Sequence, residues 1–469
     1  MNYNINKIYL FAIGAVLVSC NVTKPYKQPD LQLPAQYNTV AYSDTANIAN
    51  IPWKDFFTDT TLKSLIEKGI AYNYDLQLAV KRIESAQQQL QQAKTLQLPT
   101  LNASVSGQYN RPSKNSLNGS LSEFTGSSHY EDYILGLNLS WEADIWGKLR
   151  SEKKAAMLQY LQTYEAKKTV QTQLVADIAD GYYNLLMLDE QLRIAKSNLQ
   201  LADSTLKLTA LLKDAGDNTQ LSVEQTQAQR QTVAALIPQL EQQIALQENA
   251  LNELTGQHPQ GVARQTTLSD IPLPQQLQAG IPAAVVSHRP DVRSTEIDVM
   301  IANEKTGVAQ ANMYPNFNIT ASAGWESLKT GSWFNIPASL FGIVTGTIAQ
   351  PILNHRENKT NLEVAKIDRE QAVIKFRQSV LGAVTDVSNA LVQIDKLGEQ
   401  EKINAQQVQT LDSAISHAGL LYKSGMANYL EVITAQNSSL QSRLDLASVH
   451  CRQLIAAVAL YKSVGGGWE

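Results

Sequence analysis

Hydrophobic residues recur every seven positions along two long stretches of this chain, each with a companion series three positions further on. A seven-residue apolar repeat is typical of coiled-coil helices, and small companion residues let helix backbones approach closely. The first series is Ile178, Leu185, Leu192, Leu199 and Leu206, with companions Leu188, Ala195 and Ala202. The second is Val380, Val387, Ile394, Glu401, Val408 and Ile415, with companions Ala383, Ala390, Leu397, Leu411 and Ala418.

Proline placement supports long helices in both stretches. No proline lies between Ser113 and Ile237, and none follows Pro351. Because proline breaks a helix interior, these regions predict uninterrupted helices, the first over 147–213. In the second series Glu401, with Asn404 nearby, interrupts the apolar seam and predicts a polar layer.

Each long helix is followed by a glycine turn and a second helix. Gly216 and Gly425 mark the turns, and the returning helices are expected over 219–255 and 429–464. The sequence therefore predicts two antiparallel helical hairpins with these glycines at their tips. Pro238 lies in the first returning helix where the second has Ala447, so we expect a kink in the first alone.

Alternating apolar and polar residues predict four short strands, near 101–110, 133–142, 316–326 and 340–349. Each is about the length that a tilted strand needs to cross a bilayer. The connecting segments 111–131 and 328–339 have the composition of exposed loops. On alternation alone, a small soluble sheet is an equally good explanation.

The helix and strand signals occur twice along the chain. Asp75 and Pro99 bracket a helix followed by a strand, and Asp291 and Pro315 bracket a similar pair. We expect a first repeat over 60–256 and a second over 282–464, joined by a linker at 257–281 and followed by a tail at 465–469. Two similar halves favour the wall of a symmetric object over one asymmetric active site.

The N-terminus has the pattern of an export signal. Lys7 precedes a short apolar run that ends in Leu-Val-Ser-Cys, so residues 1–19 predict a signal peptide. The ending resembles a bacterial lipobox, in which Cys20 carries a covalent lipid and 20–59 forms an anchored segment. An ordinary signal peptide with an incidental cysteine is the alternative. Cys451 is expected to be a small packed side chain.

Composition and motifs exclude several classes of protein. The formal net charge is −4 and no basic cluster is dense enough for a phosphate backbone, which argues against nucleic acid as a partner. After residue 19 there is no apolar run of helix-spanning length, so strands would have to make any membrane crossing. The six histidines are scattered, with no HExxH pair. His417 lies on a predicted helix near the second turn, but no partner residues for metal ligation accompany it in the sequence.

Several short motifs then give the chain a resemblance to a known family. They are PWKDFF at 52–57, WEADIWGK at 141–148, RPDV at 289–292, QPIL at 350–353 and GGGW at 465–468. Together these resemble the TolC-like outer-membrane factors, specifically their lipid-anchored RND-type efflux branch. The resemblance covers nearly all of the mature chain.

The resemblance implies a mainly helical homotrimer with a small antiparallel β part. Three chains would share a twelve-stranded transmembrane β-barrel, continuous with a coiled-coil α-barrel in the periplasm. Residues 21–59, 257–281 and the C-terminus would form an equatorial zone. Such channels carry no catalytic machinery and no cofactor apart from the lipid on Cys20. They pass substrates that an inner-membrane pump delivers through a periplasmic adaptor.

The resemblance also points to a gate after the second hairpin turn. In the family this helix carries residues that narrow the periplasmic entrance, and here Leu430, Glu431 and Thr434 occupy that place. Thr434 stands where the family commonly has a second acid, so a carboxylate gate would rest on Glu431. The alternative is that Glu431 is a first-turn acid favoured by the helix dipole.

Two other classes of protein remain open at this stage. A periplasmic adaptor would also be lipid-anchored and coiled-coil, but it normally has one hairpin and does not repeat its strands. A structural coiled-coil lipoprotein would explain the seven-residue repeats without needing paired strands of bilayer-crossing length.

Overall fold

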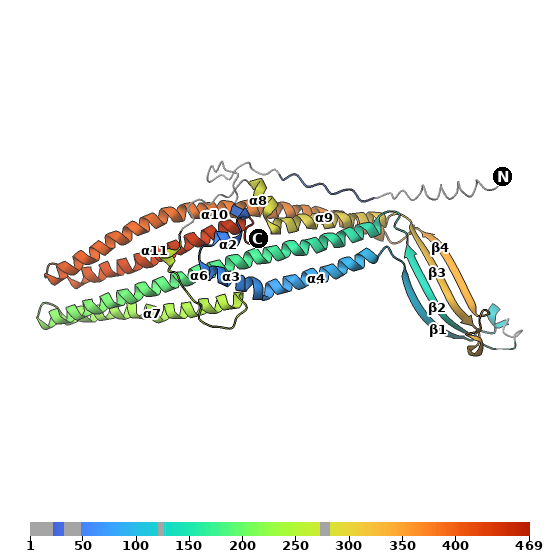
Figure 1. Ribbon diagram of the computed structural model, residues 1–469, viewed down its shortest axis with the longest axis horizontal. Helices are drawn as coiled ribbons and strands as arrows, with labels where there is room; N and C mark the ends of the chain where they lie inside the picture. Colours follow the sequence, from blue (N-terminus) through green and yellow to red (C-terminus); the bar gives the residue numbers. More distant parts are fainter. Residues whose placement is uncertain (1–21, 32–47, 121–125, 127, 273–281) are drawn as a thin grey trace. The chain divides into compact units, whose positions relative to one another are not determined.

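The chain folds mainly into helices, with one small sheet. A computed structural model describes residues 22–31, 48–120, 126, 128–272 and 282–469 (Figure 1). These fall into two compact units. Among the described residues the first unit consists of 22–29, 84–161 and 297–374, and the second of the rest. Each unit takes segments from both predicted repeats.

The first unit contains the sheet. Its strands are β1 (Thr100–Asn110), β2 (Tyr130–Glu142), β3 (Asn316–Ser327) and β4 (Leu340–Ala349), antiparallel in the order β1-β2-β3-β4. The four predicted strands are therefore confirmed, and β2 starts three residues earlier than expected. The pairing aligns Ala103 with Leu137, Leu137 with Ala323, and Ala323 with Gly342.

Helices lead into two of the strands, as the repeat predicts. Helix α4 (Tyr74–Thr95) precedes β1, and α9 (Pro290–Ala311) precedes β3. Pro99 and Pro315 each lie directly before a strand. The described shorter elements are η1 (Ile48–Asn50), α2 (Trp53–Phe56), α3 (Thr60–Tyr72), η2 (Leu268–Asp270), α8 (Pro282–His288) and η3 (Thr330–Ser332).

The long helices form the two predicted hairpins. Helices α6 (Lys148–Asp214) and α7 (Gln220–Leu254) make the first, and α10 (Glu357–Lys423) and α11 (Tyr429–Ser463) the second (Figure 1). Both leading helices have 67 residues and both returning helices have 35. Every boundary of the second hairpin lies 209 residues after its counterpart, from Lys148 to Glu357 onward. Helix α7 continues through Pro238.

Glycine is required at both hairpin turns. Gly216 has φ +87° and Gly425 has φ +75°, in the left-handed region that residues with a Cβ rarely adopt. Neither glycine would meet a neighbour if a Cβ were added, so backbone conformation alone selects glycine there.

The hydrophobic core of the second unit bears out the seven-residue pattern. Ile178 and Leu185 of α6 are fully buried, as is Val387 of α10. At the predicted polar layer, Glu401 on α10 contacts His450 on the returning helix α11. The distance from Glu401 Oε1 to His450 Nδ1 is 2.8 Å. The interruption of the seam is thus occupied by a pair of polar side chains.

Several sequence motifs that lie far apart along the chain meet at the end of α11. The rings of Phe56 and Tyr461 stack at 4.1 Å, and the Tyr461 hydroxyl donates to the carbonyl of Ile51 at 2.5 Å. Arg289 pairs with Asp291 at 2.6 Å and with Asp386 at 2.9 Å. These contacts explain why short motifs at both ends of the chain accompany the hairpin pattern.

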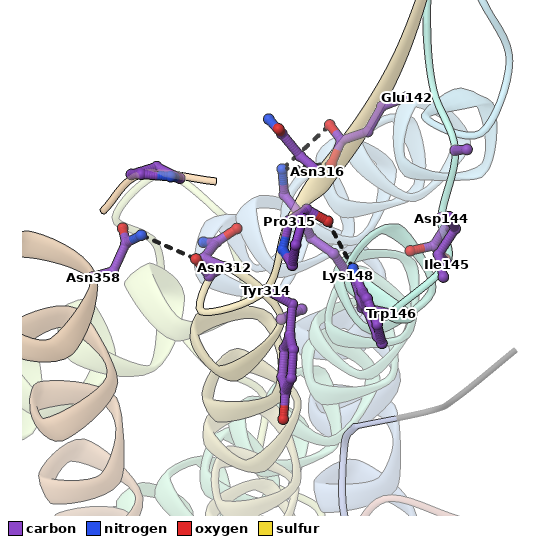
Figure 2. A pocket seen from close by; sticks show the side chains of 13 residues that line it. Glu142, Asp144, Ile145, Trp146, Lys148, Asn312, Tyr314, Pro315, Asn316 and Asn358 are labelled. Atoms are coloured by element: carbon purple, nitrogen blue, oxygen red, sulfur yellow. Dashed lines mark hydrogen bonds and ion pairs between the residues drawn. The ribbon is translucent and has the colours of Figure 1, made fainter. Parts of the chain in front are cut away.

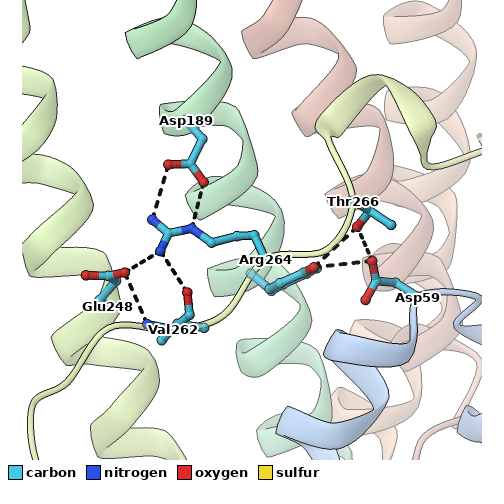
Figure 3. Close-up of polar contacts among 7 residues, drawn as sticks. Asp59, Asp189, Glu248, Val262, Arg264 and Thr266 are labelled. Atoms are coloured by element: carbon cyan, nitrogen blue, oxygen red, sulfur yellow. Dashed lines mark hydrogen bonds and ion pairs between the residues drawn. The ribbon is translucent and has the colours of Figure 1, made fainter.

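The linker after the first hairpin is fastened to that hairpin by one arginine (Figure 3). The Arg264 guanidinium donates to both carboxylate oxygens of Asp189 on α6, at 2.7 and 3.1 Å, and also pairs with Glu248 on α7. Glu248 in turn accepts from the backbone N–H of Val262 at 3.1 Å. The pKa of Arg264 is raised: burial opposes its charge, and the two carboxylates outweigh that effect.

Candidate functional site

Paired residues in antiparallel strands point to the same side, so the pairing defines the two faces of the sheet. One face is mainly apolar and the other mainly polar, although Ile134, Phe341 and Ile343 lie on the polar face. Leu137 on β2 lies between Ala103 and Ala323, whereas its neighbour Asn138 lies on the opposite face. The polar face is linked by side chains: Asn138 donates to Ser104 at 2.9 Å and accepts from Ser322 at 2.8 Å.

The apolar face is exposed on this chain. Each strand has at least one large hydrophobic side chain on this face that is 40% exposed or more: Leu101, Val105, Leu137, Ile319, Leu340, Val344 and Ile348. An apolar patch of this kind on a folded chain marks contact with a membrane or another protein. The register therefore shows which residues of each strand share the apolar face.

The tip of the second hairpin displays the predicted gate residues. The Asn428 side chain caps α11 by accepting from the backbone N–H groups of Leu430 and Glu431, at 2.9 and 3.2 Å. Leu430, Glu431 and Thr434 are exposed on this chain, while Val432 between them is buried. The three side chains thus share the uncovered side of the first helical turns.

Close to the tips, a ladder of neutral hydrogen bonds joins the second hairpin to the first. The Tyr422 hydroxyl lies 2.9 Å from the hydroxyl of Thr209 and accepts from the Asn218 side chain at 2.8 Å. Since Thr209 donates to the Thr205 carbonyl at 2.9 Å, Tyr422 is the donor to Thr209. Gln436 donates to the Thr205 hydroxyl at 2.8 Å.

Two further side-chain contacts connect the returning helices. Tyr429 donates to Gln225, and Gln229 donates to Asn437. Sequence reasoning did not single out Tyr422 or its partners. They have no local signal, because each contact joins residues about two hundred positions apart, with 213 between Tyr422 and Thr209.

The described residues offer no group of three or more metal-ligating side chains, and no helix among them is long and apolar enough to cross a membrane. His417 is exposed on α10. Cys451 is buried and free, and burial raises the pKa of its thiol to about 12. Its expected role as a packed side chain is confirmed. Cys20 lies outside the described residues.

The two-faced sheet and the paired hairpins are features of an outer-membrane channel. Comparison with known families agrees, because the outer membrane efflux protein model matches residues 65–257 and 281–466. The chain belongs to this family. The match covers both repeats, which sets aside the single-hairpin adaptor and the purely structural lipoprotein.

Individual relatives align over almost the whole chain. The cation efflux system protein CusC of Escherichia coli O6:H1 is 27% identical over 467 residues, 99% of each chain. The solvent efflux pump outer membrane protein SrpC of Pseudomonas putida is 30% identical, over 98% of each.

Solved structures give the same result. CusC superposes with a TM-score of 0.86 at 27% identity, covering 96% of this chain and 100% of that one. The open-state outer membrane channel MtrE of Neisseria gonorrhoeae gives 0.85 at 25%, covering 96% and 99%. These relatives are efflux channels rather than enzymes, and the chain is an outer-membrane efflux channel.

Proposed function

We propose that three copies of this chain form the outer-membrane channel of a tripartite efflux system, which passes small molecules or ions from the periplasm to the exterior. Three four-stranded sheets would give twelve strands, an even number above the minimum of about eight for a closed barrel. A periplasmic adaptor and an inner-membrane pump would supply the cargo.

The observation that carries this proposal is the two-faced sheet. Its apolar side chains are exposed on a single chain, as lipid-facing residues would be, and its polar side chains are linked by hydrogen bonds, as lumen-facing residues would be. In a membrane, unsatisfied strand edges are costly, so β1 and β4 would pair with neighbouring copies.

Substituting arginine on opposite faces of the same strand tests the proposal. Leu137→Arg would put a charge in lipid at a cost of about 2–4 kcal/mol, whereas Asn138→Arg would face the lumen at little cost. Leu135→Arg, on the same face as Leu137, should behave like Leu137→Arg.

The readouts are membrane insertion and native mass. We expect Leu137→Arg to lose the membrane-inserted, heat-sensitive oligomer and Asn138→Arg to retain it, with a native mass of three chains. Equal insertion of the two variants, or a native mass of one or two chains, would contradict the proposal.

We further propose that Cys20 carries a covalent lipid that anchors the mature chain. The apolar run ending in Leu-Val-Ser-Cys supports this. Labelled fatty acid should be incorporated by the natural chain and not by Cys20→Ala. Labelling of the variant, or absence of label from the natural chain, would contradict the lipobox interpretation. Neither result would bear on the proposal that the chain forms a channel.

The gate is proposed at Leu430, Glu431 and Thr434. In a trimer each exposed side chain would appear three times around the axis, so leucines would narrow the entrance and carboxylates would attract cations and repel one another. The Asn428 cap supports this role because it fixes the first turn that displays them.

A further inference from the structure

Three apolar side chains interrupt the polar face of the sheet. Ile134 is on that face because it lies four residues from Asn138 on β2. Ile343 is paired with Ser322 and, through it, with Asn138, and Phe341 lies two residues before Ile343. All three are toward the loop end of the sheet, where residues 111–129 and 328–339 connect the strands. Under the proposed function this face lines the lumen, which is usually polar.

At the helix end of the sheet, aromatic and charged side chains are engaged within the chain (Figure 2). The indole of Trp146 stacks on Tyr314 at 4.8 Å and donates to the Pro315 carbonyl at 2.7 Å. Glu142, the last residue of β2, pairs with Lys148 at 3.1 Å. These contacts hold the connections between strands and helices together, so the groups at this end have a structural role.

The ring of Phe341, by contrast, lies along the sheet over residues without side chains. Phe341 is paired with Gly324 on β3, and Gly324 with Gly136 on β2. A Cβ added at Gly136 would lie 3.4 Å from Cζ of Phe341, so the ring crosses β3 and reaches β2. Neighbouring strands lie about 4.8 Å apart, and a phenylalanine spans two such steps only when it extends parallel to the sheet. The ring is partly exposed on the side away from the sheet.

Carboxylates lie beside this apolar patch. The charged strand residues on the polar face of the described sheet are Asp132, Glu142 and Glu326, all of them acidic. Glu326 is exposed and is paired in register with Ile134, and Asp132 lies two residues before Ile134. Among the described residues, neither Asp132 nor Glu326 has a lysine or arginine within ion-pair distance. An aromatic ring with uncompensated carboxylates nearby favours a positively charged ligand.

Pairing between copies leaves the patch uncovered. The edge of β4 would join a neighbouring β1 through backbone groups that lie in the plane of the sheet. The side chain of Phe341 lies on the face of the sheet and extends toward β3 and β2 of its own chain, away from that edge. The ring would therefore still face the lumen in the assembled barrel.

We propose that Phe341, with Ile134, Ile343 and Glu326 beside it, forms a contact site in the lumen for aromatic organic cations. The ring of such a molecule stacks on Phe341, and its charge is attracted by the ring and by Glu326. The inference rests on the proposed function, because that function makes the polar face the lumen. Three copies of the chain place the site three times at one level of the barrel.

The test measures how an aromatic cation interrupts the ion current of the natural trimer in a planar bilayer. N-methylquinolinium, a planar aromatic cation, is added on the side of the strand loops, so that it reaches the site without passing the gate at Leu430. Its apparent Kd is read from the fraction of time for which the current is interrupted. We expect this Kd to rise about fivefold in Phe341→Leu, which removes the ring but keeps an apolar side chain, and about threefold in Glu326→Gln.

Phe317→Leu is the matched control, because it makes the same change on the apolar face, where Phe317 pairs with Ile348. It should leave the Kd unchanged. A second probe, 2-naphthalenesulfonate, has a similar ring system with a negative charge and should bind the natural channel about tenfold more weakly than N-methylquinolinium. An unchanged Kd in Phe341→Leu, or equal binding of the two probes, would overturn the inference.

The failure of this site and the failure of the proposed function give different results. A conducting trimer with the same Kd in the natural chain and in Phe341→Leu refutes the site alone. A natural chain that stays monomeric and does not conduct refutes the proposed function. If Phe341→Leu does not insert, the Kd in Glu326→Gln and the comparison of the two probes on the natural channel decide.

Discussion

The two hairpins have identical lengths, but their tips differ at one position that matters. Leu221 and Leu430 occupy matching places and are similarly exposed, at 58% and 52%. The next residue is Ser222 in the first hairpin, which is buried against the Thr219 cap with their hydroxyls 2.9 Å apart. In the second it is the exposed Glu431. The duplication therefore kept the turn and the leucine, and at the position after that leucine only the second hairpin has a charge.

The hairpins also differ in how they are held. The first is fastened to the linker by the charged contacts of Arg264 with Asp189 and Glu248. Near its tip, the second is held to the first by the neutral bonds of Tyr422 and Gln436. Charge-assisted hydrogen bonds are roughly twice as strong as neutral ones. Since Arg289 also pairs with Asp386 on α10, both hairpins have charged contacts away from their tips, and the weaker neutral bonds lie near the tips.

Removing the arginine of the first hairpin should have the largest effect. Arg264→Ala leaves two carboxylates without their partner, and we expect a loss of about 3 kcal/mol in the free energy of unfolding. Arg264→Lys should recover less than half, because lysine cannot bind Asp189 through two nitrogens. Arg193→Ala, which breaks an exposed pair with Glu190, is the control and should cost under about 1 kcal/mol.

Thermal or denaturant unfolding of the trimer measures these differences. If Arg264→Ala and Arg193→Ala lower the free energy of unfolding by the same amount, the contacts of Arg264 do not fasten the linker to the first hairpin.

A second effect concerns Asp180 on α6, whose counterpart on α10 is Asn389. Burial, reinforced by Asp177 and opposed by Lys462, raises the pKa of Asp180 to about 7, and its Oδ1 has no partner among the described residues. Because the folded state holds the proton more tightly than the unfolded one, stability is fullest below about pH 4 and declines as the pH rises through about 7.

Asp180→Asn should remove that decline. The full shift from 3.8 to about 7 corresponds to about 4 kcal/mol, and we expect roughly half of it, about 2 kcal/mol of added stability at pH 8. At pH 4 the variant and the natural chain should unfold together. If the free energies of unfolding of the variant and the natural chain differ by the same amount at every pH from 4 to 8, Asp180 is not the origin of the pH dependence.

A smaller effect is expected from the ladder between the hairpins. Tyr422→Phe removes the donor to Thr209 and the acceptor of Asn218, and should cost about 1–2 kcal/mol. If these bonds hold the second hairpin closed, the open fraction rises about tenfold. Thr209→Val should give a similar increase, and the double variant should add little more. Additive effects would mean that the two side chains act separately.

Much of the fold could be predicted from the sequence, because its signals are local and repeated. The helical hairpins could be predicted from the seven-residue series and the proline positions, and the strands from the two-residue alternation. Gly216 and Gly425 predicted the hairpin tips. The cap and exposure of Leu430 and Glu431 agree with the gate hypothesis, which stays a prediction.

The contacts of Tyr422 and Arg264 could not be predicted, and neither could the positive φ of Arg356, +67°. Tyr422 and Arg264 depend on partners distant in the chain. The left-handed backbone of Arg356 occupies a place where sequence alone favours glycine. The sequence also could not predict which side chains of different strands share a face, because alternation orders residues only within one strand. The register across β1, β2 and β3 places Leu137 on one face with Ala103 and Ala323.

Single-channel conductance in a planar bilayer tests most directly whether the second hairpin closes the channel. Leu430→Ala with Glu431→Ala should raise the conductance and reduce the preference for cations, because it removes both rings at the constriction. Leu221→Ala, the equally exposed counterpart on the first hairpin, and a change at Ser222 should each do less. A double variant that conducts like the natural channel, with unchanged ion selectivity, would contradict the assignment of the gate to these residues.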